Sequence, residues 1–158
     1  MQPKLMAYLK LMRFDKPVGI YLLWAPVAWG LWLANQGVPP ISLLFYFALG
    51  TVLMRAAGCV VNDMADRRID NHVSRTKARP LTSNVISMLE AWLILFGLLF
   101  IALWIVWQLP KGCLFYAFVA LAITLVYPFF KRFFKAPQIV LGIAFSMAIP
   151  MVFQASGK

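Results

Sequence analysis

Five apolar stretches, each long enough to cross a lipid bilayer, dominate this chain. A helix needs about 20 mostly apolar residues to cross the hydrocarbon layer. Stretches of that kind occupy residues 17–35, 41–61, 86–108, 113–130 and 137–155. Hydrophobic residues make up 63% of the 158 residues, which is more than a soluble domain can bury. The sequence therefore predicts an all-α fold, a polytopic membrane bundle of about five transmembrane helices, with residues 1–158 in a single domain.

The basic residues indicate how the chain lies in the membrane. The net charge is +10, but the cations occupy the gaps between apolar stretches and form no continuous tract with interleaved aromatics, which argues against nucleic-acid binding. Most of them fall in every second gap: Lys4, Lys10, Arg13 and Lys16 before the first stretch; Arg67, Arg68, Arg75, Lys77 and Arg79 in the second gap; Lys131, Arg132 and Lys135 in the fourth. The positive-inside rule then predicts a cytoplasmic N-terminus and an external C-terminus.

Several local features refine this topology. The first apolar stretch carries Pro26 and precedes four more, so we expect it to be retained and not cleaved as a signal peptide. Residues 1–16 alternate apolar and basic side chains near helical spacing, which predicts a short amphipathic helix at the membrane surface. Residues 37–40 (GVPP) predict a tight external turn. Cys59 and Cys113 form no metal-ligand spacing and are expected to be buried thiols.

The gap from residue 62 to residue 84 is longer than usual between bundled helices and concentrates acidic side chains. Asp63, Asp66 and Asp70 recur at spacings that share one helical face. Carboxylates crowded in this way suit a hard cation such as Mg²⁺, which binds one or two protein carboxylates together with substrate phosphates. The alternative is a capped, solvated helix end with salt bridges to Arg67 and Arg68.

Cations near this acidic segment could bind the phosphate-bearing substrate. The candidates are Arg75, Lys77, Arg79, Lys131 and Arg132. Taken singly, each is better explained by membrane topology, and only their combination favours substrate binding. Arg55 lies two helical turns before Asn62, where inserting a charge costs about 2.5–3.5 kcal/mol; we expect it to bind a second, anionic substrate, and the alternative is snorkelling toward the headgroups. Glu90 is expected to be a solvated residue.

These motifs resemble the intramembrane aromatic prenyltransferases, and most closely the branch that acts on 4-hydroxybenzoate in bacterial ubiquinone synthesis. The resemblance extends through nearly the whole chain. It is carried by residues 11–19 (LMRFDKPVG), 55–63 (RAAGCVVND) running into Asp66 and Asp70, 75–81 (RTKARPL) and 127–132 (YPFFKR). The Asn-Asp-x-x-Asp-x-x-x-Asp pattern is the most specific of these.

The resemblance implies a Mg²⁺-dependent enzyme of the bacterial inner membrane, with about nine helices around a central cavity. Its substrates would be polyprenyl diphosphate and 4-hydroxybenzoate, and its surroundings the lipid bilayer. By the same resemblance Asn62, Asp63, Asp66 and Asp70 would hold the metal, and Asp63, Asp66 and Arg132 would be catalytic. Asn62 and the cations Arg67, Arg75, Lys77, Arg79, Lys131 and Arg132 would bind the diphosphate, and Arg55 the carboxylate of the aromatic acid.

The resemblance further implies that an allylic cation forms as diphosphate departs and is attacked by the phenol ring ortho to its hydroxyl. The family's second aspartate motif and last four helices have no counterpart in residues 1–158. We therefore expect an N-terminal fragment of about half the enzyme. The alternatives are an inactive truncated product and a membrane transporter of ions or phosphorylated anions.

Overall fold

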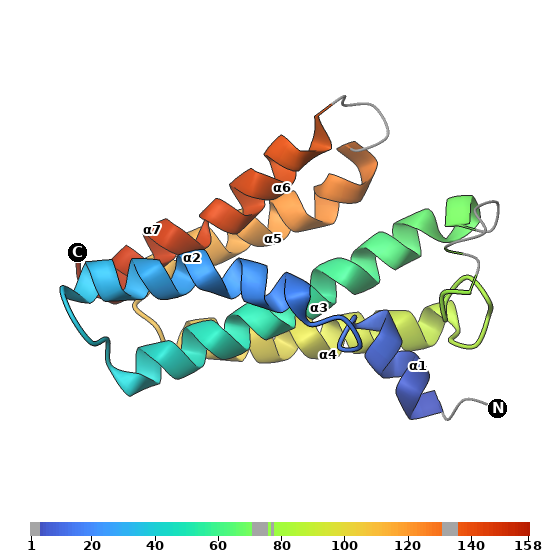
Figure 1. The fold of residues 1–158 in the computed structure, drawn as a ribbon, viewed down its shortest axis with the longest axis horizontal. Coiled ribbons are helices and arrows are strands. Elements are labelled where there is room, and N and C mark those ends of the chain that lie inside the picture. The colour runs from blue at the N-terminus through green and yellow to red at the C-terminus, as the bar shows by residue number, and fades with distance from the viewer. Residues whose placement is uncertain (1–3, 71–75, 77, 131–135) are drawn as a thin grey trace.

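The computed structural model describes residues 4–70, 76, 78–130 and 136–158, with the backbone alone for residues 68–70 and 137. Seven helices account for most of the described chain (Figure 1). They are α1 (Lys4–Leu11), α2 (Val18–Asn35), α3 (Ile41–Asp70), α4 (Met88–Trp107), α5 (Gly112–Phe130), α6 (Pro137–Ser146) and α7 (Ala148–Ala155). Within those ranges no strand occurs, and five segments are long and apolar enough to cross a membrane. The prediction of an all-helical polytopic bundle is confirmed.

The first two membrane helices form the predicted hairpin. Gln36 follows α2 in the left-handed conformation with φ 52°, and the Gly37 N–H donates to the carbonyl of Trp32 at 3.2 Å. Such a bond satisfies one of the last carbonyls of a helix, which have no partner further along the chain. Pro39 and Pro40 then prevent helix continuation until α3 begins at Ile41.

Helix α3 is longer than predicted. The sequence prediction ended this span at residue 61 because polarity rises at Asn62, whereas the helix continues to Asp70. Residues 62–70 contain neither Gly nor Pro, so nothing in the backbone chemistry stops the helix there. A helix of 30 residues is about 45 Å long, which exceeds the hydrocarbon thickness of about 30 Å. The acidic motif therefore lies on a helical extension of this span, in agreement with the helical face expected for its aspartates.

The fifth predicted span, residues 137–155, is divided into α6 and α7 with Met147 between them. Pro150 supplies the physical reason, because its ring excludes the carbonyl of Ser146, four residues earlier, and it has no N–H to donate. The two segments still form one membrane-crossing unit over Gln138–Ala155. The prediction of a continuous helix is therefore wrong, although the prediction of a span is not.

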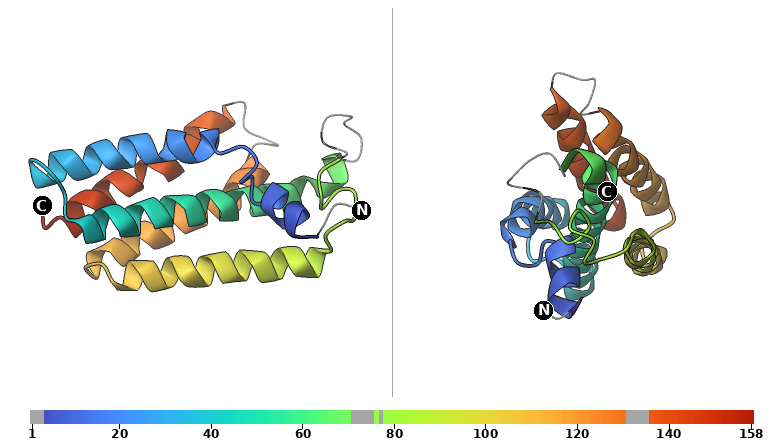
Figure 2. Two further views of the ribbon diagram at one scale, coloured as in Figure 1. Left: turned by 60° about the horizontal axis from the view of Figure 1, so that its bottom comes forward. Right: turned by 90° about the vertical axis from the view of Figure 1, so that its right-hand side faces the viewer.

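Helix α3 lies in the middle of the bundle and contacts α1, α2, α4 and α5, while α7 packs on α2 and α5 (Figures 1 and 2). One end of the bundle carries α1, the start of α2 and the end of α3; we call it the α1 end. The far end carries the turns at residues 36–40 and 108–111 and the C-terminus. Both cysteines are buried and unbridged, as predicted.

Helix α1 confirms the predicted lead-in helix and is held against the bundle at both apolar and polar positions. Ala7 and Leu11 are buried in a hydrophobic cluster with residues of α3 and α4. Tyr8 donates its hydroxyl to Glu90 Oε1 at 2.7 Å, and Lys4 Nζ approaches the same oxygen at 3.1 Å. The hydrogen bond to Glu90 raises the pKa of the Tyr8 phenol, because only the protonated phenol can donate.

Glu90 also closes a capping box at the start of α4. Its Oε2 accepts the N–H of Ser87 at 2.8 Å, while the Ser87 hydroxyl accepts the N–H of Glu90 at 3.2 Å. Two backbone donors that a helix start leaves without partners are thereby satisfied. Glu90 is partly exposed, as predicted, and in addition it links α1 to α4.

We expect Ser87→Ala to lower the melting temperature by about 2–4 °C, because losing an N-cap costs about 1 kcal/mol. Glu90→Ala should lower it further, since it removes the reciprocal half of the capping box together with the contacts to α1. Lys4→Ala is the control, because an exposed ion pair contributes little. Thermal unfolding in detergent checks the order. A Lys4→Ala effect as large as that of Glu90→Ala would contradict this account of α1 docking.

Candidate functional site

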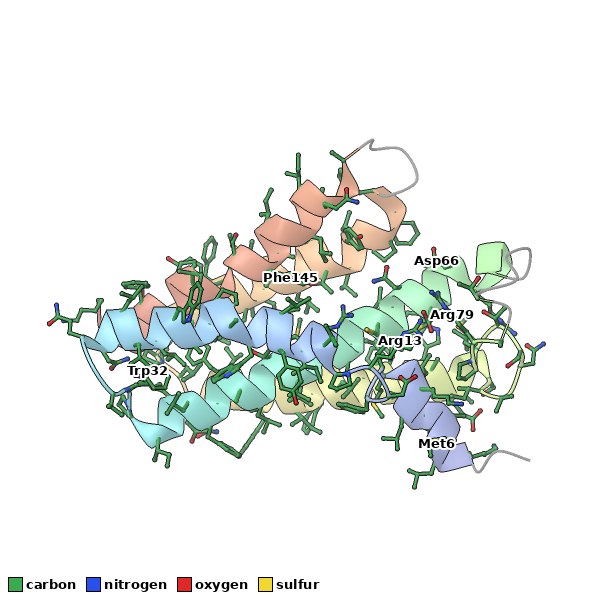
Figure 3. The ribbon with its side chains drawn as sticks, viewed as in Figure 1. Met6, Arg13, Trp32, Asp66, Arg79 and Phe145 are labelled. Atoms are coloured by element: carbon green, nitrogen blue, oxygen red, sulfur yellow. The ribbon has the colours of Figure 1, made fainter. Side chains whose placement is uncertain are left out.

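A cavity of about 570 Å³ lies inside the bundle and is lined by residues from α2 to α7. Most lining side chains are apolar, among them Phe96, Leu121, Phe145 and Met151. Figure 3 labels Phe145 on α6, on the side of the bundle opposite α4. The size falls within the range of about 300–1,000 Å³ typical of pockets for small ligands. The membrane part of the fold therefore contains a cavity lined mainly by apolar side chains.

Arg55 is the one charged residue lining this cavity among the residues that the structure describes. It projects from the middle of α3 and packs over the backbone of Gly19 in α2. A Cβ atom added to Gly19 would lie 2.5 Å from Arg55 Nε and 2.7 Å from Cζ. No described side chain forms an ion pair or hydrogen bond with the guanidinium. A partly buried cation without a counter-ion is costly, so the site suits an anion that enters with the ligand.

Asn62 lies two helical turns further along α3 and also lines the cavity. Its Oδ1 atom is buried and has no hydrogen-bond donor within the described part of the chain. An amide oxygen of this kind is a suitable ligand for a hard cation or an acceptor for a donor on a bound molecule. One wall of the apolar cavity therefore carries two polar groups. Arg55 suits an anion, whereas the Asn62 amide oxygen suits a cation or a hydrogen-bond donor.

Asp63 lies outside the cavity lining and is 3% exposed. Its Oδ1 accepts hydrogen bonds from Arg13 Nη2 and Arg79 Nη1, each at 3.1 Å, and its Oδ2 lies 3.4 Å from Arg13 Nη2. Figure 3 shows both arginines beside the α1 end of α3. The carboxylate therefore joins α3 to the turn after α1 and to the segment before α4.

Helix geometry explains why neighbouring motif residues face different ways. At 3.6 residues per turn each residue advances about 100° around the axis. Asn62 and Asp66 are therefore about 40° apart and share a face with Arg55, whereas Asp63 is about 100° away from Asn62. Figure 3 labels Asp66 on the final part of α3. Asp66 lies between the other two directions, about 40° around the helix from Asn62, which lines the cavity, and about 60° from Asp63, which faces α1.

The described part of the chain offers few side chains that could bind Mg²⁺. The described residues contain no group of three or more His, Cys, Asp or Glu side chains that could hold a metal. Asn62 and Asp66 nevertheless fit a hard cation, because they offer a buried amide oxygen and a carboxylate one helical turn apart, and Mg²⁺ usually takes few protein ligands. Metal binding by Asp63 stays a prediction, as does binding by Asp70, whose side chain lies outside the described part.

The predicted cations are only partly described. Arg79 binds Asp63, and Arg67 donates to Asn84 Oδ1 at the protein surface. Four other predicted substrate ligands lie outside the described residues and stay predictions: Arg75, Lys77, Lys131 and Arg132.

Sequence reasoning missed Arg13 and Gly19 as parts of the site. Arg13 and Gly19 both fall in residues 11–19, which carry the family resemblance, but neither was given a role in the site; Arg13 is also the one arginine among the basic residues of positions 1–16. An arginine among lysines is a usable signal, because its planar fork suits a carboxylate better than an ammonium does. Gly19 gives no comparable signal, since only the structure shows that Arg55 packs over it.

Comparisons with known proteins give a consistent picture. Residues 23–158 match the model of the UbiA prenyltransferase family. Similar curated proteins include the 4-hydroxybenzoate octaprenyltransferases of Legionella pneumophila strain Lens (59% identical over 152 residues), Nitrosospira multiformis (54% over 152) and Coxiella burnetii strain CbuK_Q154 (50% over 149). The alignments cover 96%, 96% and 94% of this chain but only 54%, 52% and 52% of those relatives. The chain thus spans about half the length of the curated relatives it matches. No solved structure matches it.

Proposed function

Because the chain belongs to the UbiA prenyltransferase family, we propose that the whole protein transfers a polyprenyl group from polyprenyl diphosphate to the ring of 4-hydroxybenzoate. The observation that carries this proposal is Arg55, a cation without a counter-ion among the described residues, in an otherwise largely apolar cavity. The choice of substrates is supported by relatives 50–59% identical to this chain that are named 4-hydroxybenzoate octaprenyltransferases. Ubiquinone biosynthesis is the corresponding context.

Arg55 would bind the carboxylate of the aromatic acid. A guanidinium matches a carboxylate with two parallel hydrogen bonds, so it fixes the ring in orientation as well as in position. Gly19 supports this role, because the absence of a side chain lets the guanidinium lie against α2. The apolar cavity accommodates the first part of the isoprenoid chain.

Asn62 and Asp66 would hold Mg²⁺ at the end of the cavity nearest α1. When bound, the metal would supply positive charge that stabilises the diphosphate as a leaving group. Arg67, Arg75, Lys77, Arg79, Lys131 and Arg132 remain the proposed cationic partners of the diphosphate. The remaining half of the protein would complete this site.

The proposed reaction is a substitution at the allylic carbon of the prenyl diphosphate. The bond from that carbon to the diphosphate oxygen breaks, and its electron pair leaves with the diphosphate. The ring carbon ortho to the phenol hydroxyl forms the new carbon–carbon bond and then releases its proton. The apolar cavity wall excludes water, which would otherwise capture the electron-poor allylic carbon.

The chain is a multi-pass membrane protein, with five candidate spans. We propose the bacterial inner membrane as its location, with the α1 end facing the cytoplasm. The support is the distribution of charge, because Lys4, Lys10, Arg13 and Lys16 precede the first span whereas the turn at 36–40 has no Lys or Arg. A reporter that is active only in the cytoplasm should be active when fused before residue 1.

The function is tested with the whole protein in membranes that lack any other 4-hydroxybenzoate prenyltransferase. Octaprenyl diphosphate and labelled 4-hydroxybenzoate should give a prenylated acid, detected by mass spectrometry, with Mg²⁺ present and not with EDTA. The isolated 158-residue chain is assayed in parallel and together with the remaining half. Metal-dependent ion or phosphate flux without prenyl transfer would instead support the transporter alternative.

We expect Gly19→Ala to raise the KM for 4-hydroxybenzoate about 10-fold. The added methyl group would overlap the Arg55 guanidinium, which must then move by rotating its own side chain. Because the end of a flexible side chain can give way, the melting temperature should change little. Gly97→Ala is the matched control, since a Cβ there meets nothing within 4 Å. An equal rise in KM for both variants would contradict the proposed contact.

A further inference from the structure

The carboxylate of Asp63 joins three segments that are distant in sequence. Arg13 follows α1, Arg79 precedes α4, and both donate to Asp63 on α3. The Asp63 side chain is 4% exposed, and those of Arg13 and Arg79 are 25% and 23% exposed. A buried carboxylate is stabilised only if such partners replace the water that it has lost. These contacts therefore hold the Asp63 side of α3 toward the turn after α1 and toward the segment before α4.

The backbone at Arg13 is organised around this contact. Arg13 has φ 62°, a conformation that is uncommon for residues other than Gly, Asn and Asp. The turn around it is held by a hydrogen bond of 2.9 Å from Phe14 N–H to Leu9 C=O and by one of 3.1 Å from Lys16 N–H to Arg13 C=O. Helix α1 itself is anchored through buried Leu11 and through Glu90. Both sides of the Arg13–Asp63 pair are thus fixed to packed helices.

We propose that Arg13 is a positioning residue that acts through Asp63 on the metal-binding face of α3. Asp63 is about 100° around the helix from Asn62, so holding Asp63 toward α1 turns Asn62 toward the cavity that it lines, with Asp66 at an angle between the two. In this assignment Asn62 and Asp66 bind the divalent cation, and Asp63 is the acceptor for the two arginines. The inference rests on the proposed function for the identity of the cation site.

Single and double variants distinguish two roles for Asp63: holding Arg13 in place, or binding the metal itself. If Asp63 acts by holding Arg13, then Arg13→Asn and Asp63→Asn disrupt the same interaction, and combining them adds little. If Asp63 binds the metal itself, Asp63→Asn should be far more damaging than Arg13→Asn combined with Arg79→Gln, which removes both arginine partners and keeps the carboxylate. Arg13→Asn is chosen because Asn tolerates a positive φ and because Arg79 still pairs with Asp63, so the fold is retained.

The experiment measures Mn²⁺ binding to the whole protein by electron paramagnetic resonance. The relevant site is the one whose Mn²⁺ signal is lost in the Asp66→Ala variant. We expect Arg13→Asn to weaken Mn²⁺ binding about 10-fold, as losses of residues that orient metal ligands do. Arg13→Lys should stay within about 3-fold of the parent protein, because an ammonium can still reach one carboxylate oxygen. Lys16→Gln is the control, since this exposed cation is three residues away.

Two outcomes overturn the proposal. One is unchanged Mn²⁺ affinity in Arg13→Asn together with a lower melting temperature, which indicates a purely structural role. The other is loss of Mn²⁺ binding in Asp63→Asn that the double variant Arg13→Asn with Arg79→Gln does not show, which makes Asp63 a ligand. A protein that binds Mn²⁺ with the expected Arg13 dependence but transfers no prenyl group refutes the proposed function and leaves this inference standing.

Discussion

Replacing Arg55 by Gln in the whole protein is expected to raise the KM for 4-hydroxybenzoate about 100-fold, while the KM for prenyl diphosphate changes less than about 3-fold. The loss corresponds to about 2.7 kcal/mol, within the range for removing one partner of a partly desolvated charge pair. The reason is that no other described residue lining the cavity carries a charge that could bind the acid. Steady-state kinetics with each substrate varied in turn provide the measurement.

An acceptor without a carboxylate supplies the control for this prediction. With a simple phenol in place of 4-hydroxybenzoate, the parent protein and Arg55→Gln should be equally slow, because the contact that distinguishes them is absent. Arg55→Lys should recover part of the loss, since it keeps the charge but not the fork. An equal loss for Arg55→Gln with both acceptors would show that Arg55 supports the cavity and does not bind the carboxylate.

Removing the Asp66 carboxylate is expected to lower kcat about 1,000-fold or more. A divalent cation contributes several kcal/mol of charge stabilisation in reactions of this kind, and Asp66 lies one helical turn after the cavity-lining Asn62, about 40° around α3 from it. Asp66→Ala should therefore resemble removal of metal with EDTA. The rate of prenyl transfer at saturating substrate, measured over a range of Mg²⁺ concentrations, checks this expectation.

Two matched variants make the Asp66 prediction specific. Asp66→Glu should retain measurable activity and require more Mg²⁺, because the carboxylate is kept but displaced by one methylene group. Lys111→Gln, at the far end of the bundle, should behave as the parent protein. Full Mg²⁺-dependent activity in Asp66→Ala would contradict the assignment of the metal to this face.

The sequence predicted the membrane helices well because the length of an apolar stretch is set by bilayer thickness. Helix α2 begins within one residue of its prediction, and α5 does too. The end of α3 at Asp70 was missed because hydropathy records where a chain leaves the membrane and not where a helix stops. The interruption at Met147 was missed although Pro150 was visible, because proline is often tolerated in membrane helices.

The site was predicted where chemistry is local and missed where it depends on tertiary contacts. Spacing along one helix was enough to select Arg55 and Asn62, and both line the cavity. Spacing could not show that Asp63 turns toward α1, because that depends on Arg13, 50 residues away in the chain. Nor could it select Gly19, whose role is to leave room for a side chain from another helix.

The contact between α7 and α2 has a consequence for how the protein is made. A Cβ added to Gly30 in α2 would lie 3.4 Å from Ile149 Cδ1 and 3.6 Å from Val152 Cγ1, so the two helices approach closely. Buried Val27 and Leu31 share a hydrophobic cluster with Val152. During synthesis α2 emerges well before α7, because α3 to α6 lie between them in the chain. The contact between this face of α2 and α7 can therefore form only after the four intervening helices have been made.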